Sequence, residues 1–195
     1  MCFLRKVMNL NFVEPIRDRK KLEVMKAILK SKSLRNHAIF VLGINSGLRV
    51  GDLLNLKVCD VFNGQKIKDR IAIREQKTNK YKNFPLSNTV KKALKEYFDS
   101  ANLSPDDYLF KSEKGGKLSR IQVWRILNGA AKTAGMNEKI GTHTMRKTFG
   151  YQAYKNGTDI YIIQQMLNHS TPSTTKRYIG LSQDDMDRAY FMLDL

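Results

Sequence analysis

The chain has 195 residues, the size of one domain or of one domain with a small appendage, and it carries a net charge of +17 with a pI near 9.9. A hydrophobic content of 42% is enough for an ordinary core and excludes a disordered chain. The positive surplus predicts a nucleic-acid partner rather than a membrane, because the basic residues are spread along the chain instead of forming one amphipathic helix. Two cysteines, Cys2 and Cys59, make no disulfide framework, and no apolar run approaches a membrane span, so we expect a soluble, cytoplasmic protein.

The N-terminal part is expected to be a lead-in, residues 1–15, followed by three helices. Apolar spacing predicts the first two helices over 18–30 and 34–45. Gly47 ends the second helix, because glycine readily adopts the left-handed turn found there. We expect this turn to place Arg49 at the start of the third helix with its guanidinium free.

A small antiparallel sheet is predicted next. Its three strands are expected at 58–62, at 67–73 and at 81–86, with residues 77–80 at the tip of a hairpin. Helices return after the sheet: the first is capped by Ser87 or Asn88, and the others cover 119–134, 145–155, 159–167 and 184–193. In the helix over 119–134 the side chains expected inside are Ile121, Trp124, Ile126 and Leu127. The fold class is therefore α+β, mainly helical, with a small three-stranded antiparallel sheet.

Two arginines fit the needs of phosphoryl transfer. Arg49 and Arg146 each present a fork of donors that matches the nonbridging oxygens of a phosphate, where the transition state concentrates negative charge. A lone arginine is far more often a surface ion-pair residue. That alternative weakens here because Arg49 follows a glycine turn and Arg146 follows His143 by three positions, on one helical face.

Tyr178 is the candidate nucleophile. Its phenol has a reference pKa of about 10, so it needs nearby cations or a base in order to attack at neutral pH. His143 is the best base, and His169 is interpreted as a donor to a phosphate oxygen. A single histidine is more often structural, but two of the three histidines of the chain fall in the stretch from 142 to 178.

The remaining candidates are less specific. Lys77 at the hairpin tip is equally well a general acid for the leaving oxygen or a solvated lysine beside Lys80. Asp52 either orients a catalytic arginine or balances the N-terminus of its helix. A basic helix carrying Arg120, Gln122 and Arg125 is a candidate for the major groove, with Lys80 as a further DNA contact. No carboxylate cluster has metal-ligand spacing, so no metal site is predicted, and a metal-dependent nuclease is disfavoured.

Together these motifs resemble the tyrosine recombinases, the phage integrase family. The matching pieces are the segment 47–53, Lys77, the segment 143–146, and Leu167-Asn168-His169 with Tyr178 nine positions later. The resemblance covers about residues 16–182 and implies that family's mainly helical catalytic fold. It implies that Arg49, Lys77, His143, Arg146, His169 and Tyr178 fill the six catalytic positions, and that strands are exchanged through a 3′-phosphotyrosine without metal, ATP or other cofactor.

The resemblance also bears on domains and partners. It implies a catalytic domain over 16–182 and a C-terminal helical tail over 183–195, as in the short stand-alone members of the family or in a fragment. Double-stranded DNA in the nucleoid, a homo-tetramer on paired sites and accessory DNA-bending proteins are the implied partners. The tail has an apolar face, formed by Met186, Ala189, Tyr190 and Leu193, which packs either in cis or on a neighbouring protomer.

Two other functions stay open at this stage. A relaxase of the type IB topoisomerase kind shares the tyrosine chemistry but needs no paired sites. A DNA-binding regulator on the same scaffold needs no catalysis, and its mark would be the loss of a catalytic residue; none of the six is missing.

Overall fold

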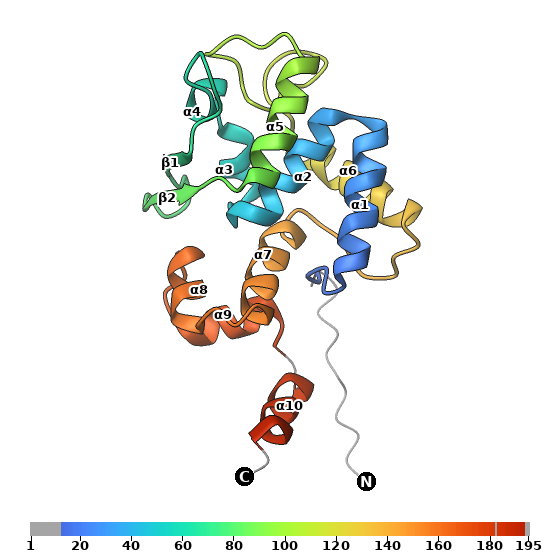
Figure 1. The fold of residues 1–195 in the computed structure, drawn as a ribbon, viewed down its shortest axis with the longest axis vertical. Coiled ribbons are helices and arrows are strands. Elements are labelled where there is room, and N and C mark those ends of the chain that lie inside the picture. The colour runs from blue at the N-terminus through green and yellow to red at the C-terminus, as the bar shows by residue number, and fades with distance from the viewer. Residues whose placement is uncertain (1–12, 182, 194–195) are drawn as a thin grey trace.

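The computed structural model describes residues 13–181 and 183–193. Within these residues the helices are α1 (Arg19–Lys32), α2 (Leu34–Ser46), α3 (Val50–Asn55), α4 (Val58–Val61), α5 (Asn88–Ser100), α6 (Arg120–Thr133), α7 (Thr144–Lys155), α8 (Ile160–Met166), α9 (Pro172–Ile179) and α10 (Gln183–Leu193). The strands β1 (Arg70–Arg74) and β2 (Tyr81–Pro85) form one antiparallel hairpin. The expected α+β, mainly helical class is confirmed (Figure 1).

Helix α2 is the centre of the main core. It packs against α1, α5 and α7, and its residues from Ala38 to Gly43 are all buried. Helix α2 and its neighbours α1 and α5 begin at side-chain caps: Asp18 for α1, Ser33 for α2 and Ser87 for α5 accept backbone N–H groups. These caps explain why the helix starts were predictable from the sequence.

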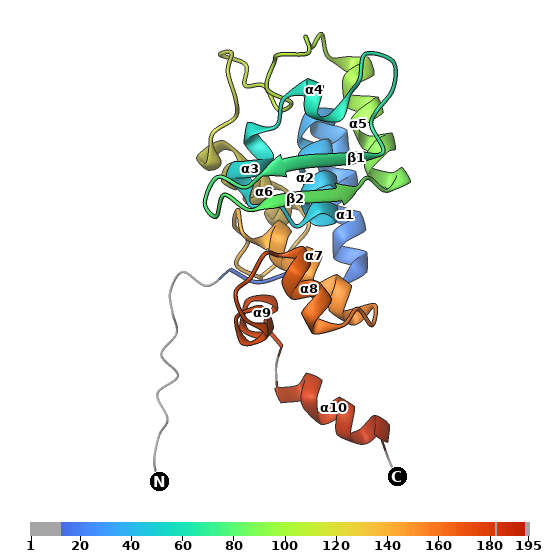
Figure 2. The same cartoon turned by 90° about the vertical axis from the view of Figure 1, so that its left-hand side faces the viewer.

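A second, smaller apolar cluster joins α7, α8 and α9. Tyr151, Ile163, Leu167 and Ile179 form its buried centre. Gly150 of α7 allows the close approach of α9, since a Cβ at this position would lie 2.6 Å from Cγ2 of Ile179. The two clusters meet at α7, and the candidate site lies at that junction. Helix α10 extends away from the rest of the molecule beyond α9 (Figures 1 and 2).

The prediction of a three-stranded sheet was wrong. Residues 58–61 form the one-turn helix α4, and Phe62 makes only an isolated bridge with Ile67. The reason lies in one local and one long-range hydrogen bond: the Asp60 carboxylate accepts the N–H of Lys57 at 2.7 Å, and the N–H of Val58 donates to the carbonyl of Asp107 at 3.0 Å. These contacts tighten the chain into a turn and override the β propensity of its valines.

Two further predictions differ from the structure. Ile121 and Trp124 of α6 were expected inside but are 63% and 49% exposed, because the buried stripe of α6 runs through Val123, Leu127 and Ala130. The helix α9 was not predicted; Thr171 caps it and Pro172 opens it. Of the expected lead-in 1–15, residues 1–12 lie outside the described residues, as does the side chain of Ala189 in the expected apolar face of α10.

Candidate active site

Arg146 occupies the most enclosed position of the site. It lies in the first turn of α7 and is 2% exposed. Its Nη1 donates to the carbonyl of Gly47 at 2.6 Å, and its Nη2 donates to the carbonyl of Leu167. The guanidinium is thus held between the loop before α3 and the end of α8, which fixes its plane.

Arg49 reaches the same place from the opposite side. Gly47 has a φ of 60°, and a Cβ there would lie 2.5 Å from Cδ1 of Phe149. Glycine is therefore required for the turn. The turn places Arg49 at the N-cap of α3, as the sequence predicted. Its side chain is only 20% exposed and its guanidinium is paired with Glu75, so the prediction of a free guanidinium was wrong.

Glu75, which the sequence reasoning missed, joins the two arginines. Its carboxylate lies 2.7 Å from Nη1 of Arg49 and 3.6 Å from Nη1 of Arg146, and the residue is 1% exposed. Burial raises the pKa of Glu75, but hydrogen bonds from Thr78 and Arg49 outweigh burial, so the net pKa is lowered and the carboxylate is ionised. The sequence held a signal: Ile71, Ile73 and Glu75 alternate along one strand, so Glu75 shares the inward face.

Tyr178 is half-buried and faces His143. Its hydroxyl lies 3.3 Å from Nδ1 of His143, across a separation of 35 residues. Burial raises the pKa of Tyr178, although Arg146 opposes the shift, so the phenol is protonated at neutral pH. Burial and the neighbouring Arg146 lower the pKa of His143, so its imidazole is neutral. A neutral imidazole beside a protonated phenol is the arrangement that a general base requires.

His169 flanks Tyr178 on another side. The ring centroids of the two residues are 4.9 Å apart in an edge-on arrangement. Burial and the two arginines lower the pKa of His169 to about 4, so this histidine is also neutral. Its Nδ1 lies 3.1 Å from the Thr175 hydroxyl. The same hydroxyl donates to the carbonyl of Thr171 at 3.3 Å, and because it has one proton, Nδ1 of His169 is the group that donates to the Thr175 oxygen.

Lys77 is placed apart from these residues. It lies in the exposed turn between β1 and β2 and makes no hydrogen bond or ion pair with any part of the chain that the structure describes. Asp52 anchors this turn: its Oδ1 accepts the N–H of Gln76 at 2.8 Å, which ties α3 to the hairpin. In Figure 2 the hairpin lies across the body, between α4 above it and α7 and α8 below it.

The candidate DNA-contact residues lie on the surface. Lys80 is exposed on the hairpin, and Arg120, Gln122 and Arg125 are exposed on α6. Arg120 packs against the start of α3, where its Nη2 would lie 2.8 Å from a Cβ at Gly51. Its charge also contributes to the lowered pKa of His143, after burial and the cations of α7. The N-terminal end of α6 therefore lies near the site around Tyr178.

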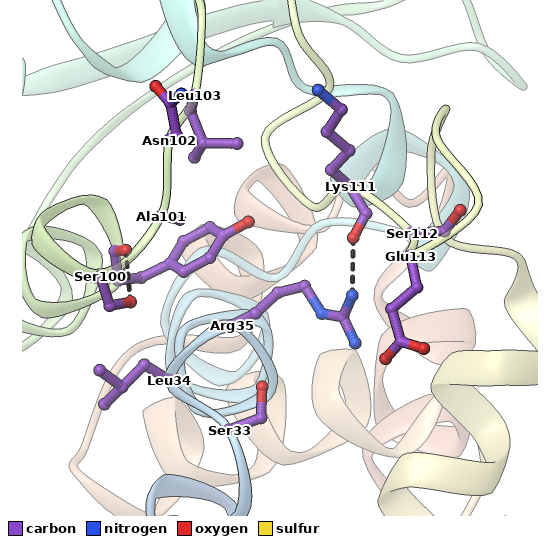
Figure 3. A pocket seen from close by; sticks show the side chains of 11 residues that line it. Ser33, Leu34, Arg35, Ser100, Ala101, Asn102, Leu103, Lys111, Ser112 and Glu113 are labelled. Atoms are coloured by element: carbon purple, nitrogen blue, oxygen red, sulfur yellow. Dashed lines mark hydrogen bonds between the residues drawn. The ribbon is translucent and has the colours of Figure 1, made fainter.

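A separate cavity of about 490 Å³ lies between the start of α2 and the loops after α5 (Figure 3). Arg35 crosses it and donates from Nη1 to the carbonyl of Lys111 at 2.7 Å. None of the predicted site residues lines this cavity. Arg35 therefore fixes a loop there, and the cavity is no part of the candidate active site.

The sequence pattern of the Phage integrase family matches residues 16–184. The chain therefore belongs to this family, the tyrosine recombinases. No helix among the described residues has both the length and the apolar character needed to cross a bilayer.

Individual relatives agree with this assignment. The chain is 43% identical over 182 residues to "Probable integrase/recombinase YoeC" of Bacillus subtilis, covering 93% of this chain and 97% of that protein. It is 32% identical over 175 residues to tyrosine recombinase XerD of Oceanobacillus iheyensis, covering 81% of this chain and 55% of the relative. The chain thus spans nearly all of the first relative and about half of the second.

Solved structures confirm the fold. The crystal structure of XerA recombinase superposes with a TM-score of 0.77 at 27% identity, over 93% of this chain and 64% of that one. A lambda integrase dimer bound to a COC′ core site gives a TM-score of 0.69 at 18% identity, over 91% of this chain and 50% of that one. The catalytic domain of tyrosine recombinases is therefore the fold of this chain.

Proposed function

We propose that the protein is a site-specific DNA recombinase that cuts and rejoins strands through a 3′-phosphotyrosine at Tyr178. The observation that carries the proposal is the distance of 3.3 Å between the Tyr178 hydroxyl and Nδ1 of His143, beside the bridged arginine pair. Membership of the phage integrase family and the names of its recombinase relatives support the same activity.

The cleavage step follows from the placement of Tyr178. Its oxygen attacks the scissile phosphorus while His143 accepts the phenolic proton at Nδ1. The bond from phosphorus to the 5′-oxygen breaks, which leaves a 3′-phosphotyrosine and a 5′-hydroxyl strand. Attack of a 5′-hydroxyl from the partner duplex reverses the chemistry and rejoins the strands. Since the ester bond is exchanged at each step, no ATP is consumed.

Charge in the transition state is balanced by the chain's own cations. Arg49 and Arg146 each offer N–H donors to the two nonbridging oxygens, and His169 donates from a ring nitrogen. Lys77 protonates the departing 5′-oxygen once the exposed hairpin closes on DNA. In this proposal the reaction requires no metal ion.

DNA binding in this proposal uses the exposed residues that surround the site. Lys80 contacts the backbone from the hairpin, and α6 enters the major groove with Arg120, Gln122 and Arg125. The net charge of +17 supplies the non-specific attraction to DNA, so we place the protein on the nucleoid in the cytoplasm.

Assembly in this proposal is a homo-tetramer on two paired sites, aided by accessory DNA-bending proteins. We take residues 16–182 as the catalytic domain and residues 183–195 as a tail. Large apolar side chains of α10 are strongly exposed: Met186 53%, Tyr190 75%, Phe191 81%, Met192 87% and Leu193 63%. Apolar surface of this extent favours burial, and we assign it to a neighbouring protomer on DNA.

A plasmid assay tests the proposal. The DNA site is first selected as a duplex to which the protein becomes covalently linked through Tyr178. Supercoiled plasmids with one or two copies of this site are then incubated with the protein in excess EDTA. We expect recombinant products from two sites only. Relaxation of one-site plasmids at the same rate would indicate a topoisomerase instead. A requirement for added divalent metal would overturn the metal-free mechanism.

A further inference from the structure

The inward face of the β1–β2 hairpin carries two charged residues. The register pairs Ile71 with Phe84 and Ile73 with Lys82, so these side chains point to one face together with Glu75, two positions beyond Ile73. Ile71 is fully buried, Glu75 is 1% exposed and Lys82 is 8% exposed. Glu75 and Lys82 are diagonal neighbours across the hairpin, although the ion pairs of Glu75 in the described structure are those with Arg49 and Arg146. They occupy the end of the face that adjoins the two arginines.

Lys82 is an unusual residue to find in this position. Its Nζ makes no hydrogen bond with the residues that the structure describes. The same holds for Oε1 of Glu75 and Oδ2 of Asp52. The centroid of the Phe84 ring lies 5.7 Å from the Lys82 nitrogen. A buried ammonium is costly unless opposite charges compensate it, and both unsatisfied oxygens belong to carboxylates of the site.

Lys82 also lines a cavity of about 380 Å³. The polar side chains in its wall are neutral apart from Lys82: Asn45, Ser46, Tyr81, Asn83, Gln165 and Asn168. No carboxylate lines this cavity, so it offers Lys82 no competing anionic partner. The opposite charges that act on Lys82 come from the catalytic cluster.

The titratable groups that act on Lys82 come from four segments: Arg49 and Asp52 at the start of α3, Glu75 after β1, Arg146 on α7 and His169 after α8. His169 is neutral. With Lys82 protonated, three cations therefore face two carboxylates, and one positive charge remains for a phosphodiester. With Lys82 neutral, the charges of the cluster cancel.

We propose that Lys82 is a positioning residue for strand cleavage: its ammonium group attracts the Glu75 carboxylate that bridges Arg49 and Arg146, stabilises this bridge electrostatically, and adds a third positive charge behind the scissile phosphate. Lys82 does not touch the DNA; it acts through Glu75 and the arginine pair. This inference rests on the proposed function, whose catalytic residues it supports.

The charge state of Lys82 depends on DNA. Burial, followed by repulsion from Arg146, lowers the pKa of Lys82 to about 7, while Glu75 opposes the shift. A phosphate bound between the arginines adds a negative charge, which raises the pKa of Lys82 and favours proton uptake on binding. The support that Lys82 gives is thus present below its pKa and lost as the pH rises through it.

The test compares single-turnover adduct formation in pre-formed complexes with a nicked duplex, across the range from about pH 6 to 9. The proteins are the wild type, Lys82→Arg, which keeps its charge throughout, and Lys82→Met, which has none. The ratio of wild-type to Lys82→Arg rates cancels the titrations of Tyr178 and His143. We expect the wild-type rate, divided by the Lys82→Arg rate, to fall several-fold as the pH rises. The Lys82→Met rate, divided by the Lys82→Arg rate, should be low at every pH. A flat wild-type ratio, or full activity of Lys82→Met at low pH, would overturn the proposal.

Lys95→Met is the matched control. Lys95 lies on α5 with its side chain 71% exposed and pairs with Asp99 on the surface, away from the site. Its loss removes the same unit of charge from the molecule. We expect the wild-type pH profile from this variant, and a changed profile would mean that net charge alone explains the Lys82 effect.

A second measurement needs no catalysis. The Lys82 side-chain carbon is followed by NMR through a pH titration of the free protein, with Lys82→Met to assign the signal. In Glu75→Gln the pKa of Lys82 should fall further, because the carboxylate that raises it is gone; an unchanged pKa would contradict the pairing. If no Tyr178 adduct forms at any pH, the proposed function fails and this titration still decides the pairing. If adducts form but the rate ratio is flat, the inference alone fails.

Discussion

A phenol attacks phosphorus as a phenolate, and the surroundings of Tyr178 bear on how it loses its proton. Burial raises the pKa of Tyr178, and burial also lowers the pKa of His143, whose Nδ1 lies 3.3 Å from the phenolic oxygen. Desolvation therefore disfavours the phenolate and keeps the adjacent base neutral. Bound DNA excludes further water, so proton transfer from Tyr178 to His143 becomes the route to the nucleophile.

The pH dependence of cleavage tests the role of His143. Its pKa lies below the ordinary histidine value of 6.5, so the competent neutral form is present above that pKa and is lost as the pH falls through it. We expect an acidic limb below the ordinary histidine range in the single-turnover rate. His143→Gln should slow cleavage about a hundredfold and remove this limb. An unchanged limb in His143→Gln would assign the base to another residue.

Arg146→Lys separates catalysis from DNA affinity. Lysine cannot bind the carbonyls of Gly47 and Leu167 and a phosphate with one planar fork. We expect cleavage to fall by about a hundredfold or more while the dissociation constant for DNA changes by less than about threefold. Arg70→Lys, at an exposed position of β1, is the control. Equal losses of binding and cleavage in Arg146→Lys would show that the residue only holds DNA.

At the level of residues, the chemistry-bearing side chains were easier to predict than those that support them. Arg49, His143, Arg146, His169 and Tyr178 come together in the structure because each stands at or near the end of a helix. Sequence patterns located the ends of α3, α7 and α8, and Tyr178 was found from its spacing to His169 although α9 was not predicted. Glu75 and Lys82 were missed because their roles depend on the hairpin register. A buried charge cannot be told from a solvated one before the neighbouring strand is placed.

At the level of elements, the turn at Gly47 determines where Arg49 lies. Gly47→Ala puts a Cβ at a φ of 60° and against Phe149, so we expect a loss of about 1–3 kcal/mol in the free energy of unfolding, with a larger relative loss of cleavage. Gly129→Ala is the matched control, because that helical glycine has open space around it and alanine favours helix. Urea denaturation measures the free energy of unfolding of both variants. Gly47→Ala with wild-type stability would contradict the requirement for glycine.

Helices were predicted more accurately than strands for a physical reason. Caps such as Ser33 and Ser119 act within one turn of chain, so their effect is visible in the sequence. The helix α4 replaced a strand because residues 58 and 59 bind carbonyls of Pro105 and Asp107, far along the chain. Likewise, which apolar stripe of α6 is buried depends on the partner helices. Long-range contacts of this kind leave no local pattern.

At the level of the whole molecule, α10 links cleavage to assembly. Replacing the exposed Tyr190 and Phe191 together by serine should leave cleavage of a single site within about twofold and lower paired-site recombination by about tenfold or more, because the apolar contact to a neighbour is lost. Val24→Ser on α1 removes a comparably placed apolar group, 45% exposed, as the control. Gel assays of single-site cleavage and of paired-site recombination measure the two effects separately. Equal loss in both would mean that α10 stabilises its own chain.

The most direct test of the central proposal is covalent trapping. The wild type and Tyr178→Phe are incubated in EDTA with nicked duplexes whose cleaved end diffuses away, and products are resolved on a denaturing gel. We predict a protein–DNA band with the wild type, a phosphorylated peptide containing Tyr178 after digestion, and no band with Tyr178→Phe despite intact DNA binding. An adduct of undiminished yield in Tyr178→Phe would contradict the assignment of the nucleophile and the mechanism built on it.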